Sequence, residues 1–371
     1  MYQRITTFAI IAIALTLVLL FITGRTVPLT AAACPGDFDG NRRVNIADFL
    51  VFVEVFGTSS ADANYNAQMD LDSSGSVDIT DFLAFVEVFG TECGGGRGDT
   101  NTTGLFTQTL FHGGVTREYI IYVPEAYDGT SRVPLMLNFH GYGGFANQYL
   151  KYADMRPLAD IENFILVYPQ GTLLGGDPHW NAGLKSDANK SDADDFGFVE
   201  ALIDEICSRY NIDSARVYAC GYSNGAFFSY ALACYHSDKI AAIGSVAGTM
   251  MEETYNNCRP SHPTAMINIH GTSDYVVPYG GGSAGLLSID EVLAYWIGFN
   301  NASTTPIVNR MNDRGVTIEH YSYTDGDNNT SVEHYKVIDG GHVWFDIGYD
   351  GSNTSRLIWN FVSRYDIHGT N

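Results

Sequence analysis

One pentapeptide, Gly221-Tyr222-Ser223-Asn224-Gly225, constrains the fold of this chain more than any other feature. It follows the β-branched and aromatic run 215–220 and precedes a helical pattern over 224–236, so a strand is expected to end and a helix to begin here. The two glycines permit a sharp turn that lifts the serine hydroxyl out of a sheet, and the helix start supplies a backbone N–H for a developing oxyanion. Ser223 is therefore predicted to be a nucleophile.

Strand-like and helix-like segments alternate from residue 105 to the C-terminus. This alternation predicts an α/β domain with a mainly parallel sheet flanked by helices. Ser288 and Glu291 form a capping-box pair at the start of one helix. The predicted strands are 117–123, 134–139, 164–168, 215–220, 239–246, 265–269 and 332–338, and the predicted helices are 195–209, 224–236, 288–299 and 354–364.

Partners for the serine follow it in the chain, each after a predicted strand. A serine hydroxyl needs a histidine to remove its proton and an acid to orient that histidine. Asp274 follows strand 265–269 and His342 follows strand 332–338, which gives the order Ser, acid, His. Alone, Asp274 is equally explained as a loop carboxylate and His342 as a surface histidine, but their order and places at strand ends favour a catalytic triad.

A glycine-rich loop directly after strand 134–139, His140-Gly141-Tyr142-Gly143-Gly144, is the candidate for the other half of an oxyanion hole. We assign the two donors to the backbone N–H groups of Tyr142 and Asn224, with Gly141 as the alternative for the first. His140 is expected to orient this loop rather than to transfer protons.

Three aromatic residues, Trp180, Tyr222 and Trp344, are expected to contact the substrate, Trp344 because it lies two residues after His342. For both tryptophans a position in the core is the alternative. Asp194 and Asp195 precede an apolar helical pattern and are expected to cap that helix rather than to act in catalysis.

The order of motifs resembles the polyhydroxybutyrate depolymerase and feruloyl esterase family of secreted esterases with the α/β-hydrolase fold. The resemblance covers residues 106–365. It implies ester hydrolysis without a catalytic cofactor, with hydroxyalkanoate oligomers as the favoured substrates and the acetyl and feruloyl esters of plant or algal polysaccharides as the alternative. An inert fold serving adhesion or scaffolding is the alternative of another class. The motifs are HGYGG, VYPQG, HWNAG, DDFGFV, GYSNGA, LAC, IHGTSD, VPYGG and GGH.

A duplication precedes this domain: DFLVFVEVFGT from Asp48 recurs as DFLAFVEVFGT from Asp81, 33 residues later. Before each copy, oxygen-bearing side chains stand at positions 1, 3, 5, 9 and 12 of an EF-hand-type loop, a pattern that suits Ca²⁺. Asx-rich turns that cap two helices are the alternative. The predicted ligands are Asp37, Asp39, Asn41, Asn45 and Asp48 in the first loop, and Asp70, Asp72, Ser74, Asp78 and Asp81 in the second.

Residues 36–91 resemble paired dockerin-type calcium repeats, which are small and all-α. The resemblance implies a cohesin-like protein partner, and a spacer stabilised by calcium is the alternative. The first loop departs from the pattern at Arg42, where glycine is usual, while the second keeps Gly75. If the halves pack antiparallel, Cys34 and Cys93 come within reach of each other.

The leading run 5–22 is apolar and uncharged and precedes Ala31-Ala32-Ala33, which predicts a signal peptide, with a membrane anchor as the alternative. Six cysteines without a C-x-x-C spacing then indicate disulfides, and we expect the pairs Cys34–Cys93 and Cys234–Cys258, with Cys207 and Cys220 bridged or as two buried thiols. The expected domains are a signal or anchor over 1–33, a calcium module over 34–93, a Gly-rich linker over 94–104 and an esterase over 105–371.

The net charge of −22 gives an acidic surface that disfavours nucleic-acid binding, because phosphates would be repelled. A solvated surface suited to a salty or calcium-rich medium is its simplest explanation. The charge does not identify a substrate.

Overall fold

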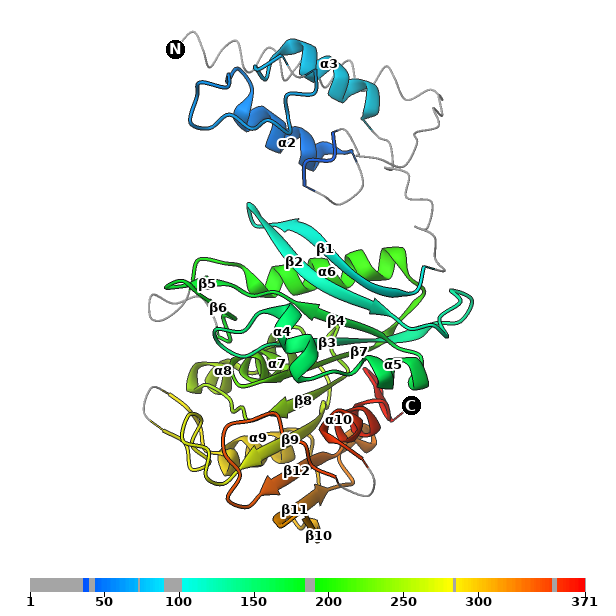
Figure 1. Ribbon diagram of the computed structural model, residues 1–371, viewed down its shortest axis with the longest axis vertical. Coiled ribbons are helices and arrows are strands. Elements are labelled where there is room, and N and C mark those ends of the chain that lie inside the picture. The colour runs from blue at the N-terminus through cyan, green and yellow to red at the C-terminus, as the bar shows by residue number, and fades with distance from the viewer. Residues whose placement is uncertain are drawn as a thin grey trace. The chain divides into compact units, whose positions relative to one another are not determined.

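The computed structural model describes residues 36–39, 44–72, 74–89, 102–183, 191–282, 285–348 and 352–370. The chain divides into two compact units, Met1–Gly98 and Asp99–Asn371 (Figure 1). Within the described ranges, no helix has the length and apolar character needed to cross a membrane. The predicted signal or anchor segment, Asn41, Cys34, Cys93 and most of the predicted linker lie outside these ranges.

A ten-stranded sheet forms the framework of the large unit, in the order β1-β2-β4-β3-β7-β8-β9-β12-β11-β10 (Figure 1). The six central strands from β4 to β12 are parallel, and antiparallel pairs extend both edges. The expectation of a mainly parallel α/β sheet is therefore confirmed. The strands are β1 (Gly104–His112), β2 (Val115–Val123), β3 (Val133–Phe139), β4 (Ile165–Pro169), β7 (Ile212–Tyr222), β8 (Ala242–Val246), β9 (Ala265–Gly271), β10 (Ile307–Asp313), β11 (Val316–Tyr323) and β12 (Val332–Val337).

Helices cover both faces of the sheet because side chains of the buried strands alternate between two cores. Leu135 and Leu137 of β3 belong to the core under α6, α7 and α9, whereas Met136 between them belongs to the core under α4, α5 and α10. The helices of this unit are α4 (Ala146–Tyr152), α5 (Arg156–Glu162), α6 (Asp195–Arg209), α7 (Asn224–Tyr235), α8 (Glu252–Asn257), α9 (Ile289–Phe299) and α10 (Thr354–Val362).

Smaller elements complete the large unit. A hairpin of β5 (Thr172–Leu174) and β6 (Asp177–His179) follows β4, and β13 (Tyr365–Asp366) pairs with β14 (Gly369–Thr370) near the C-terminus. A 3₁₀ turn spans Asp327–Asn329. The Ser288–Glu291 capping box at α9 is present as predicted. The disulfide between Cys234 and Cys258 is confirmed, and Cys207 and Cys220 are unpaired thiols, the first half-buried and the second buried.

The small unit contains α2 (Ile46–Val55) and α3 (Ile79–Val88), one from each repeat. Their facing phenylalanines form a core in which the rings of Phe52 and Phe85 stack with centroids 5.7 Å apart. These two residues occupy equivalent repeat positions, 33 residues apart. The duplication therefore builds a pseudo-symmetric pair of helices that share one aromatic core.

Candidate active site

Ser223 stands on a strained turn between β7 and α7. Its backbone has φ 54° and ψ −120°, a conformation that few non-glycine residues adopt. The flanking glycines are required by close packing: a Cβ added to Gly225 would lie 2.1 Å from the carbonyl oxygen of Phe139, and one added to Gly221 would lie 2.4 Å from the carbonyl carbon of Gly225. The start of α7 is thus pressed against the end of β3.

The three residues of the predicted triad meet at the C-terminal ends of β7, β9 and β12. His342 Nε2 lies 2.9 Å from Ser223 Oγ, and His342 Nδ1 lies 2.8 Å from Asp274 Oδ2. The order of the strands in the sheet explains this meeting, because loops that leave the same edge of neighbouring parallel strands converge.

The buried carboxylate of Asp274 is held in one orientation. Its Oδ1 accepts backbone hydrogen bonds from Val276 at 2.9 Å and Val277 at 2.8 Å, which leaves Oδ2 for His342. Burial disfavours the charged form, but the hydrogen bonds from His342 and Val277 prevail and lower the pKa of Asp274 below its usual value. The geometry therefore keeps a negative charge behind the imidazole.

Tyr222 also contacts His342. Its hydroxyl donates to the carbonyl oxygen of His342 at 2.8 Å, and the two rings lie 5.0 Å apart. Tyr222 and Trp344 are both partly exposed, and the Trp344 backbone N–H donates to the hydroxyl of Tyr152. Their expected contact with substrate stays a prediction.

The loop after β3 reaches Ser223. A Cβ added to Gly141 would lie 3.3 Å from Ser223 Cβ, so the candidate donor loop passes directly beside the serine. Asn224 is the first residue of α7, so its N–H has no acceptor within the helix. In the described part of the chain, neither this N–H nor that of Tyr142 donates to another protein group. Both assigned donors are thus available to a ligand.

The imidazole of His140 is neutral and joins this loop to Gly171. Burial lowers its pKa to about 4. Its Nδ1–H can therefore donate to the carbonyl oxygen of Gly141 at 2.7 Å, while Nε2 accepts from the backbone N–H of Gly171 at 3.0 Å. This geometry agrees with the expected orienting role and offers no contact to the nucleophile.

The prediction that Trp180 contacts substrate is not supported. Its side chain is 1% exposed and stacks on Phe228 at 5.2 Å, so the core alternative holds. Its backbone nevertheless touches the site: the Trp180 N–H donates to Asn224 Oδ1 at 2.7 Å, and Asn224 Nδ2 donates to the Trp180 carbonyl at 3.0 Å.

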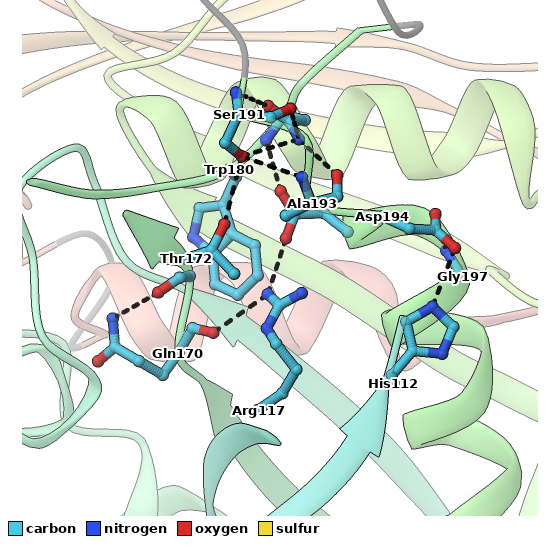
Figure 2. A network of polar contacts seen from close by, with 12 residues as sticks. His112, Arg117, Gln170, Thr172, Trp180, Ser191, Ala193, Asp194 and Gly197 are labelled. Carbon is cyan, nitrogen blue, oxygen red and sulfur yellow. Dashed lines mark hydrogen bonds and ion pairs between the residues drawn. The ribbon is translucent and has the colours of Figure 1, made fainter. Parts of the chain in front are cut away.

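Next to Trp180 lies a polar network that the sequence analysis missed (Figure 2). Asp195, expected to cap α6, instead forms a buried ion pair with Arg117 at 2.7 Å and accepts the backbone N–H of Asn181 at 2.8 Å. Asp194 alone is the helix cap, with its side chain accepting from Gly197, and it also pairs with His112 on the surface. Adjacent aspartates before a helix gave no signal that would separate these two roles.

In the small unit, each repeat gathers three carboxylates. One oxygen from each of Asp37, Asp39 and Asp48 lies within 4.8 Å of the others, and the same holds for the trio from the second repeat, Asp70, Asp72 and Asp81. The predicted ligands Asn45 and Asp78 cap α2 and α3, where their side chains accept from Ala47 and Thr80. The hydroxyl of Ser74 donates to the carbonyl of Ser76.

The fold and the Ser223–His342–Asp274 arrangement define the large unit as an α/β-hydrolase domain. Residues 117–271, a part of this large unit, match the family model described as Esterase PHB depolymerase. The resemblance drawn from the motifs is thereby confirmed for the hydrolase domain. The N-terminal repeats lie outside the matched residues.

Curated relatives agree with this family. The chain is 27% identical over 261 residues to feruloyl esterase B of Piromyces equi, covering 68% of this chain and 46% of that protein. It is 31% identical over 170 residues to the putative esterase NocK of Nocardia uniformis subsp. tsuyamanensis, and this match covers 45% of this chain and 48% of that protein. The chain thus spans less than half the length of these two relatives. Among solved structures, acetyl xylan esterase from Aspergillus awamori has the same fold, with a TM-score of 0.50, 15% identity, and coverage of 70% of this chain and 99% of that one.

Proposed function

We propose that the large unit is a serine carboxylesterase that works through an acyl-enzyme. The observation that carries the proposal is the continuous hydrogen-bonded chain from Ser223 Oγ through His342 to Asp274, with the serine on a strained turn. His342 Nε2 takes the serine proton as Oγ bonds to the ester carbonyl carbon, and the oxyanion faces the N–H groups of Tyr142 and Asn224. Collapse of this tetrahedral intermediate breaks the ester C–O bond, and the imidazole donates the proton to the leaving alcohol. Water then repeats the sequence to release the acid.

The test compares Ser223→Ala with a matched surface variant, Ser208→Ala, whose exposed hydroxyl donates to the carbonyl of Glu205. Wild type and Ser208→Ala should hydrolyse p-nitrophenyl butyrate and react with a fluorophosphonate probe. Folded Ser223→Ala should do neither. An unlabelled, inactive wild type would favour the alternative of a non-catalytic calcium-dependent adhesion or scaffold protein.

Two substrate classes have support. The names of the relatives favour feruloyl or acetyl esters of polysaccharides, since they include feruloyl esterase B and a bifunctional acetylxylan esterase/xylanase. The description of the matching family favours polyhydroxybutyrate oligomers. We propose the polysaccharide esters first, and kcat/KM on methyl ferulate, acetylated xylan and hydroxybutyrate oligomers, measured side by side, decides between them. Because such substrates are extracellular polymers, we also propose that the chain is secreted, which fits the Cys234–Cys258 disulfide.

We propose that the small unit binds one Ca²⁺ in each repeat. Each loop gathers three carboxylates, of which Asp48 and Asp81 are fully buried, and a hard cation with oxygen ligands would offset the repulsion within each trio. Asn41, Asn45, Ser74 and Asp78 remain the additional ligand candidates at their loop positions.

A cohesin-like partner is the finer proposal for this unit. In its favour, α2 and α3 each expose two large apolar side chains at equivalent repeat positions, Ile46 and Leu50 on one helix and Ile79 and Leu83 on the other. Calorimetric titration of the calcium-loaded full chain with a cohesin module tests this, and absence of heat would refute it.

A further inference from the structure

The residue between the two halves of the candidate oxyanion hole is Trp180. Two hydrogen bonds join its backbone to the side-chain amide of Asn224, the residue that follows the nucleophile. A third leaves its indole: Trp180 Nε1–H donates at 3.1 Å to the carbonyl oxygen of His140, the residue that opens the other donor loop. One residue is thus bonded to both chain segments that carry an assigned donor, to one through its backbone and to the other through its indole.

Trp180 is itself held by rigid contacts. Its ring stacks on Phe228 of α7 and meets Phe139 of β3 edge to face at 5.1 Å. The next residue, Asn181, donates its backbone N–H to Asp195, whose carboxylate is fixed by Arg117 (Figure 2). These contacts span β2, β3, α6 and α7, so the position of Trp180 is set by the scaffold.

The buried ion pair between Arg117 and Asp195 supports the Trp180–Asn181 backbone. The guanidinium of Arg117 lies 4.0 Å from the centre of the Phe198 ring and 6.0 Å from that of Trp180, and it also donates to the carbonyl of Gln170. Loss of either partner would leave an unpaired buried charge, so the pair holds the Asp195 carboxylate where it accepts the N–H of Asn181. The pair therefore specifies where the Trp180–Asn181 backbone lies.

We propose that Trp180 is a positioning residue that aligns both oxyanion donors, the loop of Tyr142 through His140 and the start of α7 through Asn224. This inference rests on the proposed serine esterase function. An oxyanion donor acts only when it points at the place where charge develops, so a small displacement weakens the transition state more than the bound substrate. Trp180 acts through these two segments and touches no reacting atom.

The first test is Trp180→Phe, which keeps an aromatic ring in the stack and removes the N–H to His140. Its matched control is Trp296→Phe: Trp296 is equally buried, stacks on Tyr230, and its Nε1 has no hydrogen-bond partner in the described residues. We expect kcat for p-nitrophenyl butyrate to fall about tenfold in Trp180→Phe, below the roughly 10²–10³-fold of losing a donor outright, with KM within about twofold. Trp296→Phe should keep the wild-type kcat.

The second test is Asn224→Ala, which removes both bonds to the Trp180 backbone and leaves the Asn224 N–H in place. Its control is Asn211→Ala, whose side chain donates to the carbonyls of Gly129 and Thr130. Inhibition by butylboronic acid, which forms a tetrahedral adduct on the serine, should weaken in Trp180→Phe and Asn224→Ala by the same factor as kcat/KM falls.

Two results separate this inference from the proposed function. If both variants lower the melting temperature but keep the kcat and boronate affinity of their controls, Trp180 only fills the core and the inference is wrong. If wild type is active but folded Ser223→Ala is equally active, the serine mechanism fails, and the positioning role fails with it.

Discussion

The replacement of Asp274 by asparagine isolates the electrostatic part of the triad. An amide at this position keeps an oxygen for the N–H groups of Val276 and Val277, so the loop geometry is preserved. Its NH₂ group then faces His342 Nδ1, now 2.8 Å from a carboxylate oxygen. Because two donors cannot pair, the imidazole must carry its proton on Nε2, the atom that should accept the proton of Ser223.

We expect Asp274→Asn to lower kcat by about 10⁴-fold, the size known for a triad with the wrong tautomer, which corresponds to about 5.5 kcal/mol of transition-state stabilisation. The assay is kcat/KM for p-nitrophenyl butyrate, with folding checked by circular dichroism. Asp194→Asn is the control, because it makes the same change at the surface cap of α6. A folded Asp274→Asn protein that keeps more than about a tenth of wild-type activity would refute the role of the carboxylate.

Three further predictions concern the stability and the thiols of the full chain. Calcium should raise the melting temperature of the small unit without changing esterase activity, and Asp81→Asn should weaken this response; a calorimetric melt unchanged by EDTA would exclude the metal. Burial lowers the pKa of His140 to about 4, so the unfolded state takes up a proton first as the pH falls from about 6.5. His140 should therefore lower the free energy of unfolding by about 2 kcal/mol at pH 5 relative to pH 7. Urea unfolding of His140→Gln should show a shallower dependence of this free energy on pH than wild type. Thiol titration of the denatured, unreduced protein should label Cys207 and Cys220 and neither half of the disulfide within the large unit.

The central strands and the triad were predictable because their signals are local. Each buried strand is a short apolar run, and Ser223, Asp274 and His342 each follow one, so their meeting is a consequence of parallel order. The edge hairpin β10–β11 was missed because its strands are mostly exposed and carry polar residues, which weakens the strand pattern. The short helices α4 and α5 span only two turns each and present little periodicity.

The support behind the site was not predictable, because its partners are distant in the chain. Arg117 and Asp195 are 78 residues apart, and a lone arginine in a strand carries no sign of its partner. The prediction that Trp180 contacts substrate was wrong because the sequence around an isolated tryptophan in a loop does not indicate whether its side chain is buried. In the small unit, the two capping residues Asn45 and Asp78 satisfy helix N–H groups, a role that the calcium-loop pattern did not separate from metal binding.

The backbone conformation of Ser223 carries a cost that is independent of chemistry. Its φ of 54° and ψ of −120° match the first central position of a type II′ turn, where glycine is favoured. Ser223→Gly should therefore be inactive, yet its free energy of unfolding should exceed that of wild type by about 1 kcal/mol. Its melting temperature should rise accordingly. A screen of variants for thermal stability alone would enrich glycine at this position and discard the proposed nucleophile, so only selection for turnover would keep a serine there.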